Sequence, residues 1–437
     1  MFHRTKLIRG SACLVLATVG VLTAGCSSST SASGSGTGSS PGAADRGPIT
    51  FAVGKDTSGN LQKQVDAWNT AHPSEAVTIS ELPASADGQL QQLQQNAQVK
   101  SDAYAVLGLD VTWTAEFAAN RWIDQMPAST DTSGLLASAV DSAEYRGNLY
   151  AVPWETNGGL LFYRSDLLTA AGITTPPTTW QQITDDCAKV KAVPAGKGVD
   201  CYAGQFDKYE GLVVNFSEAV QSAGGKVFDD NGNPTVNTPQ ATAALAWLAT
   251  SFKNGTIPHA ALTYQEENGR QAFQAGSLLF LRQWPYVWDL ANKTDGSSKV
   301  AGKFAVAPLP GQNGIGSSTL GGYNLAISSF AKHKTTAKDF ITYLTSADEE
   351  RANLLATSTA PTRTGLYDDA TLQKQFPYLS DLKQSLQSAV ARPKAVHYGD
   401  VSTAIQDAIY PVLSGQGDPA TALASLQTKL TQITSQK

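Results

Sequence analysis

Hydrophobic and polar positions alternate along the chain in an order that predicts strands separated by helices. Short apolar runs at 49–53, 77–79 and 104–109 predict strands, and the stretches 61–68 and 90–97 between them carry apolar residues at helical spacing. Strands that alternate with helices in this way pair into a mostly parallel sheet, which helices cover on both faces. The first part of the chain therefore predicts one α/β unit.

A second series of strands and helices begins near residue 160. The predicted elements are a short helix capped by Ser165 and ending at Gly172, a long helix from Thr238-Pro239 to Gly255, strands at 277–281, 304–306 and 325–328, an amphipathic helix through 340–344, and two helices within 401–430 that join at 415–417. The length of 437 residues agrees with two or three domains.

The N-terminus differs from the rest of the chain. A basic start, an apolar stretch at 12–22 and small residues before Cys26 are typical of a secretory signal. An eleven-residue apolar helix would rise only about 16 Å, too little to span a bilayer. Leu22-Thr23-Ala24-Gly25-Cys26 resembles the lipobox of bacterial lipoproteins, although Leu is usual where Thr23 stands. The resemblance implies removal of residues 1–25 and lipidation of Cys26; a freely secreted protein is the alternative.

The segment 26–47 is built almost entirely from Ser, Gly, Thr, Ala and Pro, so we predict a flexible tether behind the lipidated Cys26. Such an anchor would hold an exported protein at the outer face of the cytoplasmic membrane. Because Cys13 would be removed with the signal, Cys187 and Cys201 remain as a pair. In an oxidising compartment two remaining thiols usually form a disulfide, which would stabilise the fold by about 3 kcal/mol.

Net charge and missing motifs exclude several functions. The net charge of −5 becomes −8 without the basic signal, which disfavours nucleic acid and anionic lipid as partners. Gly-x-Ser-x-Gly patterns occur only around Ser33 and Ser35 in the tether, and neither His-Glu-x-x-His nor a P-loop is present. No motif implies a metal or a cofactor. Paired carboxylates that cleave glycosides have no characteristic spacing in the sequence, so an exported glycoside hydrolase remains an alternative function. A surface receptor or adhesion module is a further alternative.

Three turn-rich segments, 153–159, 283–288 and 321–324, combine aromatic residues with amides and charges. Aromatic faces stack on sugar rings, while Asp, Asn, Glu and Arg bond the hydroxyl groups. We therefore predict that Trp284 and Tyr286 belong to a neutral-sugar site. For Trp68, Trp122 and Trp247, which lie on helical faces, we predict core packing instead.

The same segments resemble a known family. Those that carry the resemblance are 149–154 with 159–168, 272–276 with 281–286 (the "AFxxGxxxFxRxWPY" pattern), 320–328 and 391–393. They are similar to the extracellular solute-binding proteins of sugar ABC importers, in the trehalose/maltose-binding branch. The resemblance implies a two-lobed, type II periplasmic-binding-protein fold, in which each lobe is a mostly parallel sheet flanked by helices and the ligand cleft lies between the lobes. The first lobe would be 48–156 plus 325–372 and the second 157–324 plus 373–437.

The resemblance also implies a monomeric binding protein without catalysis that delivers its sugar to a membrane permease. The residues it places at the ligand are Lys55, Asp56, Ser85 (with Asp87 as the alternative), Asp110, Glu155, Asn157, Glu266, Trp284, Tyr286, Gly322, Tyr323 and Arg392. Glu155 and Asn157 stand where relatives often have Tyr and Asp, which implies a different sugar preference. Arg392 is expected to close over the ligand with several donors.

Overall fold

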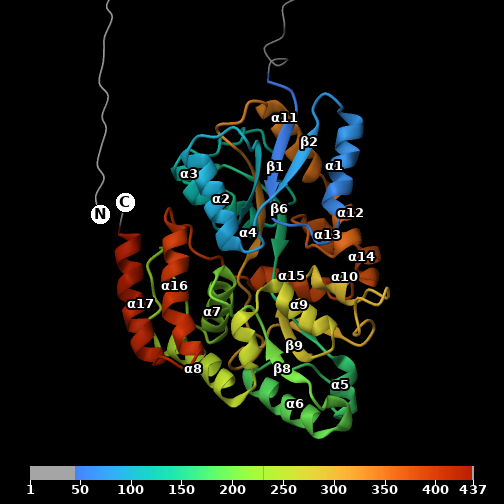
Figure 1. Cartoon of the computed structure of the whole chain (residues 1–437), viewed down its shortest axis with the longest axis vertical. Helices are drawn as coiled ribbons and strands as arrows, with labels where there is room; N and C mark the ends of the chain where they lie inside the picture. Colours follow the sequence, from blue (N-terminus) through green and yellow to red (C-terminus); the bar gives the residue numbers. More distant parts are fainter. Residues whose placement is uncertain (1–44, 230, 436–437) are drawn as a thin grey trace, which may run out of the picture. The chain divides into compact units, whose positions relative to one another are not determined.

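Two mixed sheets organise the part of the chain that the structure describes, residues 45–229 and 231–435 of a computed structural model (Figure 1). The first sheet has the order β2 (Val77–Glu81), β1 (Ile49–Val53), β3 (Val106–Asp110), β11 (Gly321–Ile327) and β6 (Val152–Asn157). The second has the order β10 (Ala305–Pro308), β7 (Leu160–Tyr163), β9 (Leu278–Gln283) and β8 (Asp200–Ala203). A small hairpin joins β4 (Glu144–Tyr145) to β5 (Asn148–Leu149). The predicted signal and Cys26 lie outside the described residues.

The strand directions correct one expectation. In the first sheet β1 is parallel to β2 and β3, but β11 is antiparallel to β3 and β6. In the second sheet only β8 and β9 are parallel, so the prediction of a mostly parallel sheet is wrong there. Parallel pairing needs a crossover within one sheet. The chain instead crosses between the sheets at 158–159 and 309–320, so β7 and β11 each enter a sheet from the opposite lobe.

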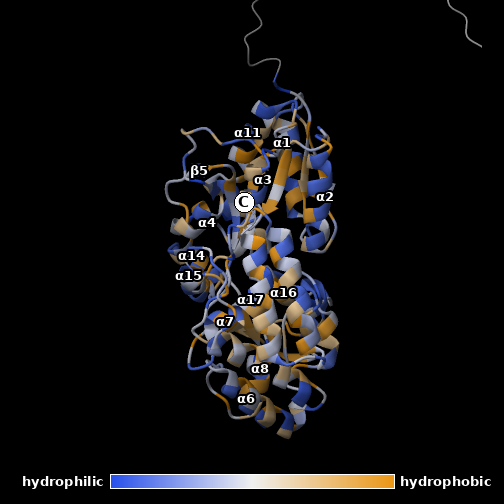
Figure 2. Cartoon of the chain, turned by 90° about the vertical axis from the view of Figure 1, so that its left-hand side faces the viewer, coloured by the Kyte–Doolittle hydropathy of each residue, from blue (hydrophilic) through white to orange (hydrophobic). Residues whose placement is uncertain are grey.

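Helices cover both faces of the first sheet. Residues alternate along β1: Phe51 packs in one buried cluster with α1 and α11, and Ala52 packs in another with α2 and α3. The helices of this lobe are α1 (Asn60–Ala71), α2 (Ala86–Gln98), α3 (Thr114–Ala119), α4 (Ala137–Ser142), α11 (Lys334–Leu344) and α12 (Ala347–Thr357). In Figure 2 the hydrophobic colour is concentrated in the strands beside α2, whereas the helices carry both colours.

The buried residues of the second sheet belong to a larger hydrophobic cluster, which also includes Leu354 and Tyr367. Its helices are α5 (Ser165–Ala170), α6 (Trp180–Ala192), α7 (Glu210–Ser222), α8 (Pro239–Asn254), α9 (Glu266–Gln274), α10 (Val287–Ala291), α13 (Thr364–Tyr367), α14 (Ala370–Gln375), α15 (Leu379–Ser388), α16 (Tyr398–Leu413), α17 (Pro419–Thr434) and the 3-10 turns η1 (Pro194–Gly196) and η2 (His259–Thr263). None of the helices in the described residues is long and apolar enough to cross a bilayer.

Local sequence signals account for both ends of α8. Thr238 accepts a hydrogen bond from the backbone of Ala241, and Gly255 ends α8 in the left-handed conformation that glycine adopts without strain, so both predictions are confirmed. Ser165, however, is the first residue of α5 rather than its cap. Arg164 takes the cap position and pairs with Asp166, so the prediction for Ser165 is wrong.

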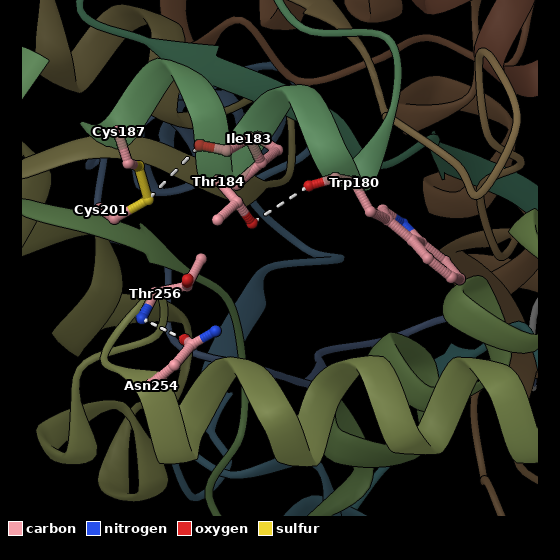
Figure 3. Close-up of a disulfide and its surroundings, with 7 residues drawn as sticks. All are labelled: Trp180, Ile183, Thr184, Cys187, Cys201, Asn254 and Thr256. Carbon is pink, nitrogen blue, oxygen red and sulfur yellow. Dashed lines mark hydrogen bonds between the residues drawn. A yellow bond between two sulfur atoms is a disulfide. The ribbon is translucent and has the colours of Figure 1, made fainter. Parts of the chain in front are cut away.

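The predicted disulfide between Cys187 and Cys201 is confirmed and links α6 to β8 (Figure 3). At the other end of α6, Trp180 stacks on Trp247, with ring centroids 4.5 Å apart. Trp68 is 5% exposed and packs on Phe340. Core packing of Trp68 and Trp247 is thus confirmed, and Trp122 packs against the cluster of the first sheet.

Candidate functional site

A cavity of about 450 Å³ is lined by residues from both lobes. Eleven of the twelve predicted site residues line it: Lys55, Asp56, Asp110, Glu155, Asn157, Glu266, Trp284, Tyr286, Gly322, Tyr323 and Arg392. Ser85 does not, although its neighbours Ala84 and Ala86 do. Its hydroxyl accepts a hydrogen bond from the backbone of Gly88 at 3.3 Å and so caps α2.

The first lobe contributes polar residues from the ends of its strands. Lys55 and Asp56 follow β1, and Asp110 ends β3; the carboxyl ends of parallel strands meet at one edge of a sheet. Asp56 is held by local donors: Oδ1 accepts from the backbone of Ser58 at 2.7 Å, and Oδ2 accepts from the backbone of Leu61 at 2.9 Å. Its carboxylate is therefore fixed at the start of α1.

Glu155 is the half-buried carboxyl of this wall. Burial raises its pKa to about 8, and the negative charges of Asp56 and Glu350 act in the same direction. Asn353 donates a weak hydrogen bond to Glu155 Oε1 at 3.5 Å, and no cation among the described residues pairs with it. At neutral pH the group therefore carries a proton in most molecules and can donate a hydrogen bond.

The second lobe contributes an aromatic wall directly after β9. The guanidinium of Arg282 lies 3.8 Å from the centroid of the Trp284 ring. Arg282 is 1% exposed, and its Nε donates to Glu218 Oε2 at 2.7 Å within a buried ion pair. Gly321 lies close to the edge of the indole, because a side chain there would place its Cβ 2.9 Å from Trp284 Cη2. The ring thus has a fixed position with a cation behind it.

The carboxyls beside these aromatics already have partners. Tyr286 donates to Glu267 Oε1 at 2.8 Å, and Arg270 forms an ion pair with Glu267. Glu266 accepts a hydrogen bond from Tyr209 at 2.8 Å, and burial raises the pKa of Glu266. This wall is therefore held together by its own hydrogen bonds.

Gly322 and Tyr323 lie in β11, where the two walls meet. Gly322 has φ +124°, and a Cβ there would lie 2.1 Å from the carbonyl oxygen of Glu155, so no other residue fits. This close approach brings β11 and β6 together beside the cavity.

Arg392 is placed differently from the expectation that it closes over a ligand. Its side chain is 2% exposed and joins carboxylates of both lobes: Nη1 donates to Glu210, and Nη2 donates to Asp110 Oδ1 at 3.0 Å. Nη2 also lies 3.4 Å from the carbonyl oxygen of Leu320, whereas Nε has no partner among the described residues. Most of its donors are thus used within the protein.

Sequence reasoning missed several lining residues. The polar ones are Thr57, Ser58, Gln64, Gln89, Glu210, Gln265, Glu267, Asn268, Asp289, Asn353, Thr357 and Thr359. Glu267 and Gln265 adjoin Glu266, so the predicted segment could have included them. Asn353, Thr357 and Thr359 come from α12 and its end, far from any predicted motif in sequence. In the residues that the structure describes, no three His, Cys, Asp or Glu side chains are placed to hold a metal ion.

Comparison with known proteins extends these findings. Residues 54–351 match the family described as bacterial extracellular solute-binding proteins. The probable ABC transporter-binding protein of Deinococcus radiodurans is 33% identical over 398 residues, which cover 88% of this chain and 93% of the relative. The mannitol-binding protein of Pseudomonas aeruginosa is 27% identical over 298 residues, which cover 65% and 66%.

Among solved structures, the maltose-bound MalE3 of T. maritima is similar to this chain with a TM-score of 0.83 at 32% identity. The match covers 88% of this chain and 99% of the other. The two-lobed α/β fold that the resemblance implied is thereby confirmed.

Proposed function

Because the chain belongs to the bacterial extracellular solute-binding proteins, we propose that it is the substrate-binding component of an ABC importer and captures a neutral di- or oligosaccharide of the trehalose/maltose type. The observation that carries this proposal is the composition of the two cavity walls. One wall presents Trp284 and Tyr286, and the other presents Asp56 and Glu155. A ring stacked on the aromatic wall can bond its hydroxyl groups to the opposite carboxyls.

The size of the cavity supports a small saccharide. A volume of about 450 Å³ falls in the lower half of the usual range for small-molecule sites. Two further comparisons favour this ligand class: the similar structure from T. maritima is described as maltose-bound, and the relative from Pseudomonas aeruginosa as mannitol-binding. A disaccharide fits the aromatic wall better than a short polyol, because only a ring offers a flat C–H face for stacking.

Binding would work by closure of the lobes. A ligand that contacts both walls favours the closed state, because only that state makes both sets of contacts. The lobes would be close to the expected 48–156 plus 325–372 and 157–324 plus 373–437, except that β11 belongs to the first sheet from Gly321 onward and α13 packs in the cluster of the second sheet. The crossing segment 158–159 lies at the boundary between them. The closed monomer would then deliver the sugar to permease subunits in the membrane.

Hydrolysis of the sugar is the alternative function, and the carboxyls argue against it. Glycosidases combine a protonated carboxylic acid with an ionised carboxylate across the scissile bond. The pKa of Glu155 on one wall and that of Glu266 on the other are both raised by burial. These two carboxyls are shifted in the same direction and so do not divide the roles of acid and base between them, and the family to which the chain belongs is one of solute-binding proteins. We therefore propose binding without catalysis.

The family is extracellular, so the protein is exported. We further propose that the lipidated Cys26 and the tether 26–47 anchor it to the outer face of the cytoplasmic membrane. Replacing Cys26 by Ala should release the protein into the medium and abolish incorporation of labelled fatty acid. Release without any change in labelling would contradict lipidation at this position.

A thermal-shift screen tests the proposed ligand class. Trehalose, maltose and longer α-glucosides should raise the melting temperature, because a ligand at one hundred times its Kd stabilises the folded state by about 2.7 kcal/mol. Mannitol serves as the non-ring control. Stabilisation by mannitol alone would overturn the saccharide proposal, and release of glucose during incubation with the protein would favour the hydrolase.

A further inference from the structure

Helix α7 begins without a side-chain cap from its own segment. Its N-cap residue, Tyr209, makes no capping hydrogen bond. The backbone N–H of Glu210, the first residue of the helix, instead donates to Asp87 Oδ1 at 3.1 Å. Asp87 lies in the first turn of α2, which packs in a cluster of the first lobe, whereas α7 packs in the core of the second lobe. One lobe thus supplies the cap for a helix of the other.

The second carboxylate oxygen of Asp87 also contacts the opposite lobe. Gln406 of α16 donates to Asp87 Oδ2 at 3.1 Å, and its Nε2 also lies 2.9 Å from Ser402 Oγ. From Val401 onward helix α16 packs in the core of the second lobe, although Tyr398 at its start packs in a cluster of the first. Both carboxylate oxygens of Asp87 are therefore bonded to the opposite lobe.

Asp87 does not line the cavity, although Ala86 and Gln89 on the same helix do. This separates it from Arg392, which also joins the two lobes but lines the cavity itself. A change at Asp87 should consequently alter how the lobes meet without removing a group that faces the ligand.

We propose that Asp87 is a positioning residue for lobe closure: its carboxylate caps α7 across the lobe boundary, favours the docked arrangement of the lobes and thereby sets ligand affinity without touching the ligand. A carboxylate at a helix N-terminus satisfies a free backbone N–H and interacts favourably with the helix dipole. The bond can form only when the lobes meet, so its free energy belongs to the closed state. Apparent affinity depends on the fraction of molecules that are closed.

The chain contains a matched control. Asp348 follows Ser346-Ala347 at the start of α12, as Asp87 follows Ser85-Ala86 at the start of α2, and both Ser residues cap their helices. Both Asp residues are exposed and lie in the first turn of a helix. The structure gives the carboxylate of Asp348 no hydrogen bond or ion pair with any described residue. Asp348→Ala therefore removes the same dipole contribution but no contact between lobes.

Small-angle scattering of the full mature chain without sugar is the first test, and it does not depend on the identity of the ligand. Asp87→Ala should have a larger mean radius of gyration than wild type, and Asp348→Ala should match wild type. Asp87→Asn keeps an acceptor oxygen and should lie between. Equal radii for Asp87→Ala and wild type would overturn the closure proposal, whether or not the protein binds sugar.

Calorimetric titration with a saccharide that stabilises wild type is the second test, and it alone rests on the proposed function. Asp87→Ala should weaken binding about fivefold, or about 1 kcal/mol, with Asp348→Ala unchanged. Unchanged or tighter binding by Asp87→Ala would overturn the link to affinity. If no saccharide binds wild type, the proposed function fails, while the scattering result still decides the closure contact.

Discussion

The two walls of the cavity hold their carboxyl groups in different ways. On the second lobe, Glu267 has both Arg270 and Tyr286 as partners, and Trp284 is fixed against the buried pair of Arg282 and Glu218. On the first lobe, Glu155 is half-buried with only one weak hydrogen bond. The carboxyl groups of the second lobe therefore have partners within the protein, whereas Glu155 on the first lobe, unlike its neighbours Asp56 and Asp110, has hydrogen-bonding capacity left over.

This difference indicates a division of labour between the lobes. A preorganised wall loses little conformational freedom when it binds, so it is suited to accept the ring of the ligand first. A wall with unused hydrogen-bonding groups gains most when ligand hydroxyls reach it, which occurs only on closure. The comparison leads to three predictions, one for the support of the aromatic wall, one for its surface and one for the opposite carboxyl.

The largest effect is expected at the support of the aromatic wall. Arg282→Met should lower the free energy of unfolding by about 3–5 kcal/mol, because it leaves the carboxylate of Glu218 buried without its cation. Chemical denaturation measures this loss. The double variant Arg282→Met, Glu218→Leu removes both charges and should recover much of the stability. A double variant as unstable as the single one would contradict the role given to the pair.

A smaller effect is expected at the surface of the same wall. Trp284→Ala should weaken sugar binding about tenfold to hundredfold, or about 1.4–2.7 kcal/mol, because the stacking face is lost. Trp284→Phe keeps an aromatic face and should bind more tightly than the Ala variant in calorimetric titration. Since Trp284 is only half-buried, both variants should remain folded. An unfolded Trp284→Ala protein would assign the ring to the core instead.

Much of this molecule follows from local sequence signals. β1 and α8 were predicted within one residue because their bounds depend on an apolar run, a Thr-Pro start and a Gly end. The disulfide followed from the number of cysteines left after export. Trp284, Tyr323 and Arg392 were found because they stand in segments that resemble one family. Lys55, Asp56 and Asp110 were found because they follow the ends of predicted strands, where side chains meet at one edge of a sheet.

Other features depend on contacts between distant segments. The antiparallel direction of β11 follows from its crossing at 309–320, which no local pattern records. The partners of Arg392 are Asp110, 282 residues earlier, and Glu210, 182 residues earlier, so its use within the protein was invisible in the sequence. For the same reason Asp87 could be named only as an alternative to Ser85, without its role across the lobes.

The smallest and most specific effect is expected at Glu155, the carboxyl of the first lobe whose pKa burial raises from 4.5 to about 8. Between these pH values the folded protein retains a proton that the unfolded chain releases, so stability falls as pH rises through this range. Glu155→Gln removes the titration. The melting temperature of wild type should therefore decrease more steeply from pH 5 to pH 8 than that of the variant.

The difference between the two curves isolates Glu155, because Glu116 and Glu350, whose pKa values burial raises to about 7, remain in both proteins. Glu81→Gln, at the exposed end of β2, is the control and should follow wild type. If the Glu155→Gln curve is parallel to that of wild type, the pKa of Glu155 is not raised in the folded protein, and the contrast between the two walls is wrong. If the curve is flatter, Glu155 is protonated in the folded protein near neutral pH, and its carboxyl group can donate a hydrogen bond to a ligand hydroxyl.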